Sequence, residues 1–197
     1  MNGLNILGIN GCNEKNASSL HALRYCLHEA EKNKVETDVF DLAKVEIPIF
    51  SVEAMKNPPA AVISFISKIK EADALIWSTP LYHGSLTGIL KNALDWLEIL
   101  RTEIPPYLTH KVVGLICVAG GNQGIQGINS MNFIARALRA WTIPYSVAIA
   151  DSYRVFDKDG NLNDQDQIEK LNLLARELIE GARLMSNSNS NKQNIIS

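Results

Sequence analysis

The chain has 197 residues, of which 46% are hydrophobic and 20% are charged, and its formal net charge is −2. This length suits one domain, and the near-balanced charge gives no basis for binding nucleic acid or an anionic membrane. No apolar run approaches the roughly 20 residues of a membrane helix, and the N-terminus lacks the basic region of a signal peptide. Cys12, Cys26 and Cys117 have neither metal-ligand spacing nor a paired framework. We therefore expect a cytoplasmic protein with reduced thiols and no metal site.

The first part of the chain alternates between strand-like and helix-like segments. An apolar strand is predicted over residues 4–9, then a polar loop over 10–19 and a helix with apolar spacing over 20–34. Residues 35–42 resemble a strand but include three acidic residues, which favours an edge position in the sheet. Strand, loop and helix in this order are typical of a βαβ unit.

The middle of the chain contains the most distinctive segment. After a connection over residues 43–59 and a helix marked by apolar residues at 62, 65, 66 and 69, a buried strand is predicted over 74–77. The chain then turns at Thr79-Pro80 and again at His83-Gly84. A helix with an apolar stripe follows, and Ser85 is its predicted N-cap.

The second half repeats the alternation. An irregular segment is expected over residues 101–110, followed by a strand over 112–119 that is buried on both faces and a loop over 120–124. A helix ending near Trp141 and a strand over 143–150 come next. A turn-rich connection over 151–163 then leads to a helix marked by apolar residues from 168 to 182. Residues 186–197 have no apolar pattern and are predicted to be a disordered tail. We therefore expect residues 1–185 to form a single domain.

The segment WSTPLYHGSLTGILKNALDWL, residues 77–97, resembles a flavin-contacting loop of the NADPH-dependent FMN reductase family. That family commonly reads T-P-x-Y-[NH]-G-S, then a small residue, then L-K-N-x-L-D. The matching positions are Thr79, Pro80, Tyr82, Gly84, Ser85, Leu90, Lys91, Asn92, Leu94 and Asp95. The resemblance implies bound FMN, with NADPH or NADH as co-substrate, and a flavodoxin-like fold.

The predicted elements fit that fold. Five strands alternating with five helices, with a polar second strand, favour an α/β three-layer sandwich whose five-stranded parallel sheet has the order 2-1-3-4-5. Strands one, three and four are then neighbours. Ligands in such sheets bind at the carboxyl ends of the strands, so the three loops that follow these strands should form one site.

The first of these loops, residues 10–19, is interpreted as a phosphate cradle because it is rich in Asn and Ser and leads into a helix N-terminus. Its candidate cofactor-binding residues are Gly11, Cys12, Asn13, Asn16, Ser18 and Ser19. Alternatively, Asn16, Ser18 and Ser19 only cap the helix. The family usually has G-S-x-R-x-x-S here, whereas this chain has Gly11-Cys12 in place of Gly-Ser and lacks the Arg. Lys15 is the candidate to supply the positive charge of the missing Arg. Cys12 is either a small loop residue or, less favoured, a thiol activated by the helix.

The second and third loops are expected to meet the flavin ring. Their candidate residues are Pro80, Leu81, Tyr82, His83 and Gly84 in the second loop, and Gly120, Gly121, Gln123 and Gly124 in the third. Gly84 is expected to have a positive φ angle. Tyr82 either packs beside the ring or covers the loop, and His83 either donates a proton or, more simply, shapes the loop. A nucleotide-phosphate reading of the third loop is disfavoured because G-x-G-x-x-G is not satisfied.

The leading hypothesis is therefore an FMN-dependent oxidoreductase that takes hydride from NAD(P)H and reduces a flavin, quinone or similar small acceptor by a ping-pong mechanism. The resemblance also implies a homodimer or homotetramer. The alternative is a flavodoxin-like electron carrier that docks to redox partner proteins, although the pI of about 6.1 and the loop sequence NGCNEKNASS both count against it.

Overall fold

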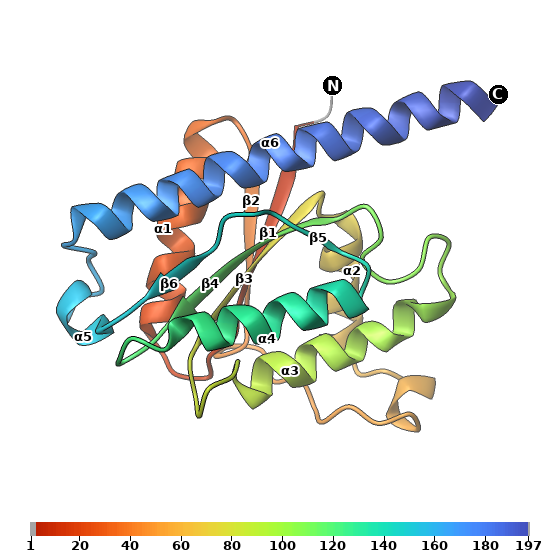
Figure 1. Ribbon diagram of the computed structural model, residues 1–197. Helices are drawn as coiled ribbons and strands as arrows, with labels where there is room; N and C mark the ends of the chain where they lie inside the picture. The colour runs from red at the N-terminus through yellow and green to blue at the C-terminus, as the bar shows by residue number, and fades with distance from the viewer. Residues whose placement is uncertain (1–2, 197) are drawn as a thin grey trace.

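The computed structural model describes residues 3–196, and the side chains of residues 3–187. The strands are β1 (Asn5–Asn10), β2 (Glu36–Asp41), β3 (Ala74–Pro80), β4 (Val112–Val118), β5 (Trp141–Thr142) and β6 (Val147–Ile149). The helices are α1 (Ser18–Lys32), α2 (Ala60–Glu71), α3 (Gly88–Asp95), α4 (Gly124–Ala137), α5 (Ser152–Val155) and α6 (Gln165–Ile196), with 3-10 turns at Ala54–Lys56 and Trp96–Thr102. The strands form one parallel sheet in the order β2-β1-β3-β4-β5, with β6 also paired to β4, which confirms the predicted order (Figure 1).

Helices cover both faces of the sheet, so the molecule has three layers. Figure 1 shows α1 and α6 on one face and α2, α3 and α4 on the other. Strand β4 is buried along its whole length, and its side chains alternate between the two cores. Val113 and Leu115 pack with α2, α3 and α4, whereas Ile116 and Val118 pack with α1 and α6. Burial of β4 on both faces, which its apolar run predicted, is therefore confirmed.

The edge position of β2 is also confirmed. It pairs with β1 alone among the described strands, and its outer half alternates between exposed and partly buried residues. Glu36 and Asp38 are tolerated there because they are exposed to water, whereas Asp41 is buried and accepts a hydrogen bond from the Asn10 side chain.

The last strand position differs from the prediction, which placed one continuous strand over residues 143–150. Two short strands, β5 and β6, occupy it instead, and both run parallel to β4. The amide of Ile143 still donates to the carbonyl of Val113 at 3.1 Å. Pairing resumes only at Val147, with the register shifted by two residues, because Thr142 is paired with Val113 whereas Val147 is paired with Ile116. Pro144 lies in this interruption, as is typical of Pro near irregularities in a sheet.

The C-terminal segment also differs from the prediction. Helix α6 continues to Ile196, so residues 186–196 have a helical backbone where a tail without regular structure was expected. This Ser- and Asn-rich segment lacks an apolar stripe, but it contains no Gly or Pro that would end the helix. Residue 197, the last of the predicted tail, lies outside the described residues.

Candidate FMN site

The three candidate loops leave the sheet side by side, at the carboxyl ends of β1, β3 and β4 (Figure 1). The strand register pairs Asn10 with Ser78 and Pro80 with Val118, so the strands end at nearly the same level. The amide of Gly11 donates to the Ser78 carbonyl at 2.7 Å, which continues the pairing into the first loop. The fold thus brings together three segments that are far apart in the sequence.

The first loop ends at a helix start that no side chain caps. The N-cap of α1 is Ala17, and the amides of Leu20 and His21 both donate to its carbonyl. The proposed capping role of Asn16, Ser18 and Ser19 is therefore wrong, because no side-chain cap hydrogen bond is present. The amides of Ser18 and Ser19 precede this first hydrogen bond of the helix, and the first turn has no acidic residue. Such a helix start suits an anion.

The two serines of this turn have different surroundings. Ser18 is partly buried, whereas Ser19 is only 1% exposed and its hydroxyl donates to Oδ1 of Asn10 at 3.1 Å. The Asn10 side-chain amide in turn donates to Asp41 at 2.7 Å, and the Ser78 hydroxyl donates to the Ser19 carbonyl at 2.7 Å. The Ser19 hydroxyl thus belongs to an internal network. Because this hydroxyl already has an acceptor within the protein, Ser19 can contribute to a ligand site through its backbone amide.

The remaining candidates of the first loop divide by exposure. Asn13 and Asn16 are exposed, as is Lys15, while Gly11 is buried with Leu90 so close that a Cβ on Gly11 would lie 2.8 Å from it. Cys12 is 2% exposed, and burial is the main cause that raises the pKa of its thiol. An activated thiol would need a lowered pKa, so the structure favours the plain reading of Cys12 as a small loop residue.

The second loop contains a tight turn at His83 and Gly84. Tyr82 and Ser85 exchange two backbone hydrogen bonds of 3.1 Å, and the residues between them have φ angles of 50° and 82°. Positive φ at both central positions is the geometry of a type I′ turn, which favours Asn-Gly. The predicted positive φ of Gly84 is confirmed. The same geometry explains why either Asn or His fits position 83, since both tolerate the left-handed region better than most residues.

The helix after this loop begins later than predicted. Ser85 is not its N-cap; the cap is Thr87, whose Oγ1 accepts from the Leu90 amide at 3.2 Å. The same hydroxyl donates to the Gly11 carbonyl at 2.6 Å, and the Thr87 amide donates to Oγ1 of Thr79 at 3.2 Å. Thr87 is thus a site-building residue that the sequence analysis missed. A Thr two positions before Ile89, the first apolar residue of this helix, was the available signal.

The third loop is open at its start and closely packed at its end. Gly120, Gly121 and Gln123 are exposed, and a Cβ on either of the first two glycines would meet no atom within 4 Å. Gly124 is buried and begins α4; a Cβ there would lie 3.1 Å from Cβ of Ala148. The candidates of this loop thus comprise an exposed part that a ligand can approach and one residue that packs α4 onto β6.

These features fit FMN. The uncapped start of α1 suits its phosphate. The turn formed by exposed His83 and partly buried Gly84, together with exposed Gly120 and Gly121, suits the flat ring, beside Tyr82, which is 47% exposed. Within residues 3–196, no cluster of three or more His, Cys, Asp or Glu could hold a metal ion, and no helix is long and apolar enough to cross a membrane.

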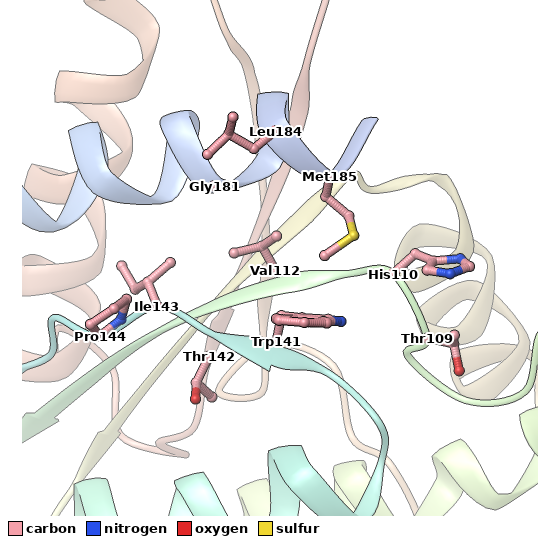
Figure 2. A pocket seen from close by; sticks show the side chains of 10 residues that line it. All are labelled: Thr109, His110, Val112, Trp141, Thr142, Ile143, Pro144, Gly181, Leu184 and Met185. Carbon is pink, nitrogen blue, oxygen red and sulfur yellow. The ribbon is translucent and has the colours of Figure 1, made fainter. Parts of the chain in front are cut away.

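An apolar cavity lies at the opposite end of the sheet. Its volume is about 600 Å³, and it lies between the start of β4, β5 and the C-terminal part of α6 (Figure 2). Val112 and Trp141, the first residues of β4 and β5, line this cavity, whereas the three loops follow the last residues of β1, β3 and β4. None of the candidate residues lines this cavity.

Comparisons with known proteins identify the family of this chain. A model of the family described as NADPH-dependent FMN reductase matches residues 4–154. The FMN-dependent NADPH-azoreductase of Staphylococcus haemolyticus (strain JCSC1435) is 33% identical over 178 residues, which cover 86% of this chain and 88% of that protein.

Two solved structures share the fold. The flavoenzyme NAD(P)H:(acceptor) oxidoreductase FerB from Paracoccus denitrificans superposes with a TM-score of 0.76 at 17% identity, covering 92% of this chain and 98% of that one. A flavodoxin from the domain Archaea superposes with a TM-score of 0.64 at 8% identity, covering 91% and 99%. The flavodoxin-like fold is therefore confirmed. The family match extends over most of the chain and includes all three loops, so this protein belongs to the NADPH-dependent FMN reductase family, with FMN as cofactor and NADPH as co-substrate.

Proposed function

We propose that FMN binds across the three carboxyl-end loops and that the protein transfers reducing equivalents from NAD(P)H to a small-molecule acceptor there. The observation that carries this proposal is the convergence of an uncapped helix start, a type I′ turn and an open glycine pair at one edge of the sheet. Family membership makes FMN the natural occupant of that edge. Each part matches the chemistry of one part of FMN.

The chain's own residues have binding and orienting roles in this proposal. The first-turn amides of α1, at Ser18 and Ser19, hold the phosphate, and the amides of His83 and Gly84 face the polar edge of the ring. When bound, FMN supplies the hydride chemistry, so no side chain needs to act as a nucleophile. His83 shapes the turn, because its positive φ is a sufficient reason for its presence.

Azo compounds are the acceptors to test first. The staphylococcal relative named above is an FMN-dependent NADPH-azoreductase and covers most of this chain. Full cleavage of an azo bond consumes two NADPH and two protons and yields two amines. Free flavins and quinones are the other acceptors in this proposal, because all of these molecules are flat and conjugated.

The three loops border one exposed edge, and we propose that NAD(P)H and the acceptor use it in turn. Anaerobic mixing of the purified protein with FMN and then NADPH should bleach the flavin absorbance, and an added azo dye should restore it. Unchanged absorbance after NADPH is added would reject the reductase proposal.

One observation supports the electron-carrier alternative: the fold of this chain is similar to that of the archaeal flavodoxin. A carrier would bind FMN tightly and be reduced by a partner protein, but not by NADPH alone. The same anaerobic experiment therefore separates the two functions. The family match favours the reductase.

A homodimer or homotetramer in the cytoplasm completes the proposal. The segment 101–110 is one candidate for the subunit contact, since its Ile104 is 97% exposed. Helix α3 is the other. Sedimentation at micromolar concentration tests this, and a monomer would contradict it.

A further inference from the structure

Gln126 lies at the junction of the second and third loops and was not among the residues expected to bind the cofactor. It belongs to the first turn of α4, directly after the exposed glycine loop. Its amide donates to the Gln123 carbonyl at 3.0 Å, and its carbonyl accepts from the Ser130 hydroxyl at 3.0 Å. The backbone of Gln126 is therefore held in place while its side chain is exposed.

The Gln126 side chain lies against the turn of the second loop. A Cβ placed on Gly84 would lie only 2.7 Å from Oε1 of Gln126, a spacing that real Cβ atoms do not adopt. The glycine therefore leaves the space that the Gln126 amide occupies. Gly127 lets the helix approach this closely, because a Cβ on it would lie 2.5 Å from the Cys117 sulfur and 3.2 Å from Leu81.

The Gln126 amide has free hydrogen-bonding capacity at this position. The Gln126 side chain has no hydrogen-bond partner among residues 3–187, whose side chains are described. Within the same residues, no salt bridge forms at the His83–Gly84 turn. A primary amide offers two donors and one acceptor. That combination matches the polar edge of a flavin ring, which carries carbonyl oxygens on both sides of an N–H group.

We propose that Gln126 is a cofactor-binding residue whose side-chain amide, which lies against Gly84, hydrogen-bonds the polar edge of the flavin and favours its reduced form. This inference rests on the proposed placement of FMN at the three loops. Reduction adds negative charge to the ring, and an amide N–H beside that edge stabilises such charge, whereas a carboxylate opposes it. Gln126 would therefore influence the reduction potential as well as the affinity.

The test compares the wild type with Gln126→Glu and Gln126→Ala, and with Asn129→Asp as a control. Asn129 is exposed and lies one helical turn further along α4, so its substitution adds the same charge to the same helix. Quenching of flavin fluorescence gives the dissociation constant of oxidised FMN. Equilibration with a reference dye gives the midpoint potential of the bound flavin.

In Gln126→Glu we expect reduced FMN to bind about tenfold more weakly relative to oxidised FMN, which lowers the two-electron potential by about 30 mV. Gln126→Ala should lower it less, and Asn129→Asp should match the wild type. An unchanged potential and affinity in both Gln126 variants would overturn the inference, as would an equal shift in Asn129→Asp. If Gly84→Val also leaves FMN affinity unchanged, the placement of FMN at these loops is itself wrong, and this outcome is distinguishable from failure at Gln126 alone.

Discussion

The hydroxyl of Thr87 donates a hydrogen bond to the carbonyl of Gly11 at 2.6 Å, across a sequence separation of 76 residues. Thr87 is 3% exposed, and the same oxygen caps α3 by accepting from the Leu90 amide. One side chain therefore joins the first loop to the helix that follows the second loop. The relative placement of these two parts of the site depends on it.

Thr87→Ala should lower both stability and FMN affinity. The substitution removes an N-cap, which costs about 1 kcal/mol, and leaves the buried Gly11 carbonyl without a partner, which costs about 1–3 kcal/mol more. Urea unfolding and FMN titration measure the two effects. Thr87→Ser keeps the hydroxyl and is the matched control, so equal losses in both variants would contradict the role of that hydroxyl.

The two serines at the start of α1 should respond differently to substitution. Ser18→Ala should weaken FMN binding by about 1–3 kcal/mol if its hydroxyl helps to bind the phosphate, with little change in stability. Ser19→Ala should lower the free energy of unfolding by a similar amount, about 1–3 kcal/mol, because it leaves Asn10 short of a buried partner. FMN titration together with urea unfolding of each variant separates the effects. The reverse assignment would show that Ser19, and not Ser18, faces the cofactor.

Gly84→Val should strain the second loop. Gly84 has a φ angle of 82°, where a β-branched residue costs more than about 1 kcal/mol, and its Cβ would also displace Gln126. Flavin affinity should therefore fall more than stability. Gly120→Ala is the control for stability, because its Cβ would meet nothing within 4 Å. A Gly84→Val variant that binds FMN as tightly as the wild type would contradict this expectation.

The buried thiols should make the protein less stable at high pH. Burial raises the pKa of Cys117 to about 12, and it raises the pKa of the fully buried Cys26 as well. In the unfolded chain a thiol ionises near pH 8.5, so above that pH the unfolded state loses protons that the folded state keeps. The free energy of unfolding should then fall by about 1.4 kcal/mol per pH unit for each such thiol.

This stabilising contribution is complete below the thiol pKa of the unfolded chain and is lost as the pH rises toward the folded value. Urea unfolding at several pH values from roughly 8 to 11 measures it. Cys26→Ala should lower stability at neutral pH because it leaves a cavity, yet its stability should fall less steeply with pH. Parallel curves for the wild type and the variant would show that Cys26 ionises alike in both states.

The proposed shared use of one exposed edge predicts ping-pong kinetics. Steady-state rates at several acceptor concentrations should give parallel double-reciprocal lines. His83→Asn should preserve flavin reduction by NADPH, because Asn also tolerates the φ angle of 50° at this position. Intersecting lines would mean that both substrates bind together, and loss of flavin reduction in His83→Asn would mean that the imidazole takes part in the chemistry.

Much of the architecture could be predicted because local patterns have local causes. The apolar run at 112–118 required burial on both faces, and the acidic residues near 36–41 required an edge. The His83-Gly84 dipeptide required a turn with positive φ, which the structure shows. With the right-handed crossover rule, these features led to the strand order and to the edge where the three loops meet.

The contacts between those loops were decided only by the tertiary structure. Whether Ser18 or Ser19 faces inward depends on the rotation of α1 against Asn10, and whether Ser85 or Thr87 caps α3 depends on the Gly11 carbonyl across the sheet edge. The placement of Gln126 against Gly84 depends on how closely α4 packs on β4. A hydrogen-bonding side chain has several possible partners within its own segment, and only the packing of distant segments determines which of them is within reach.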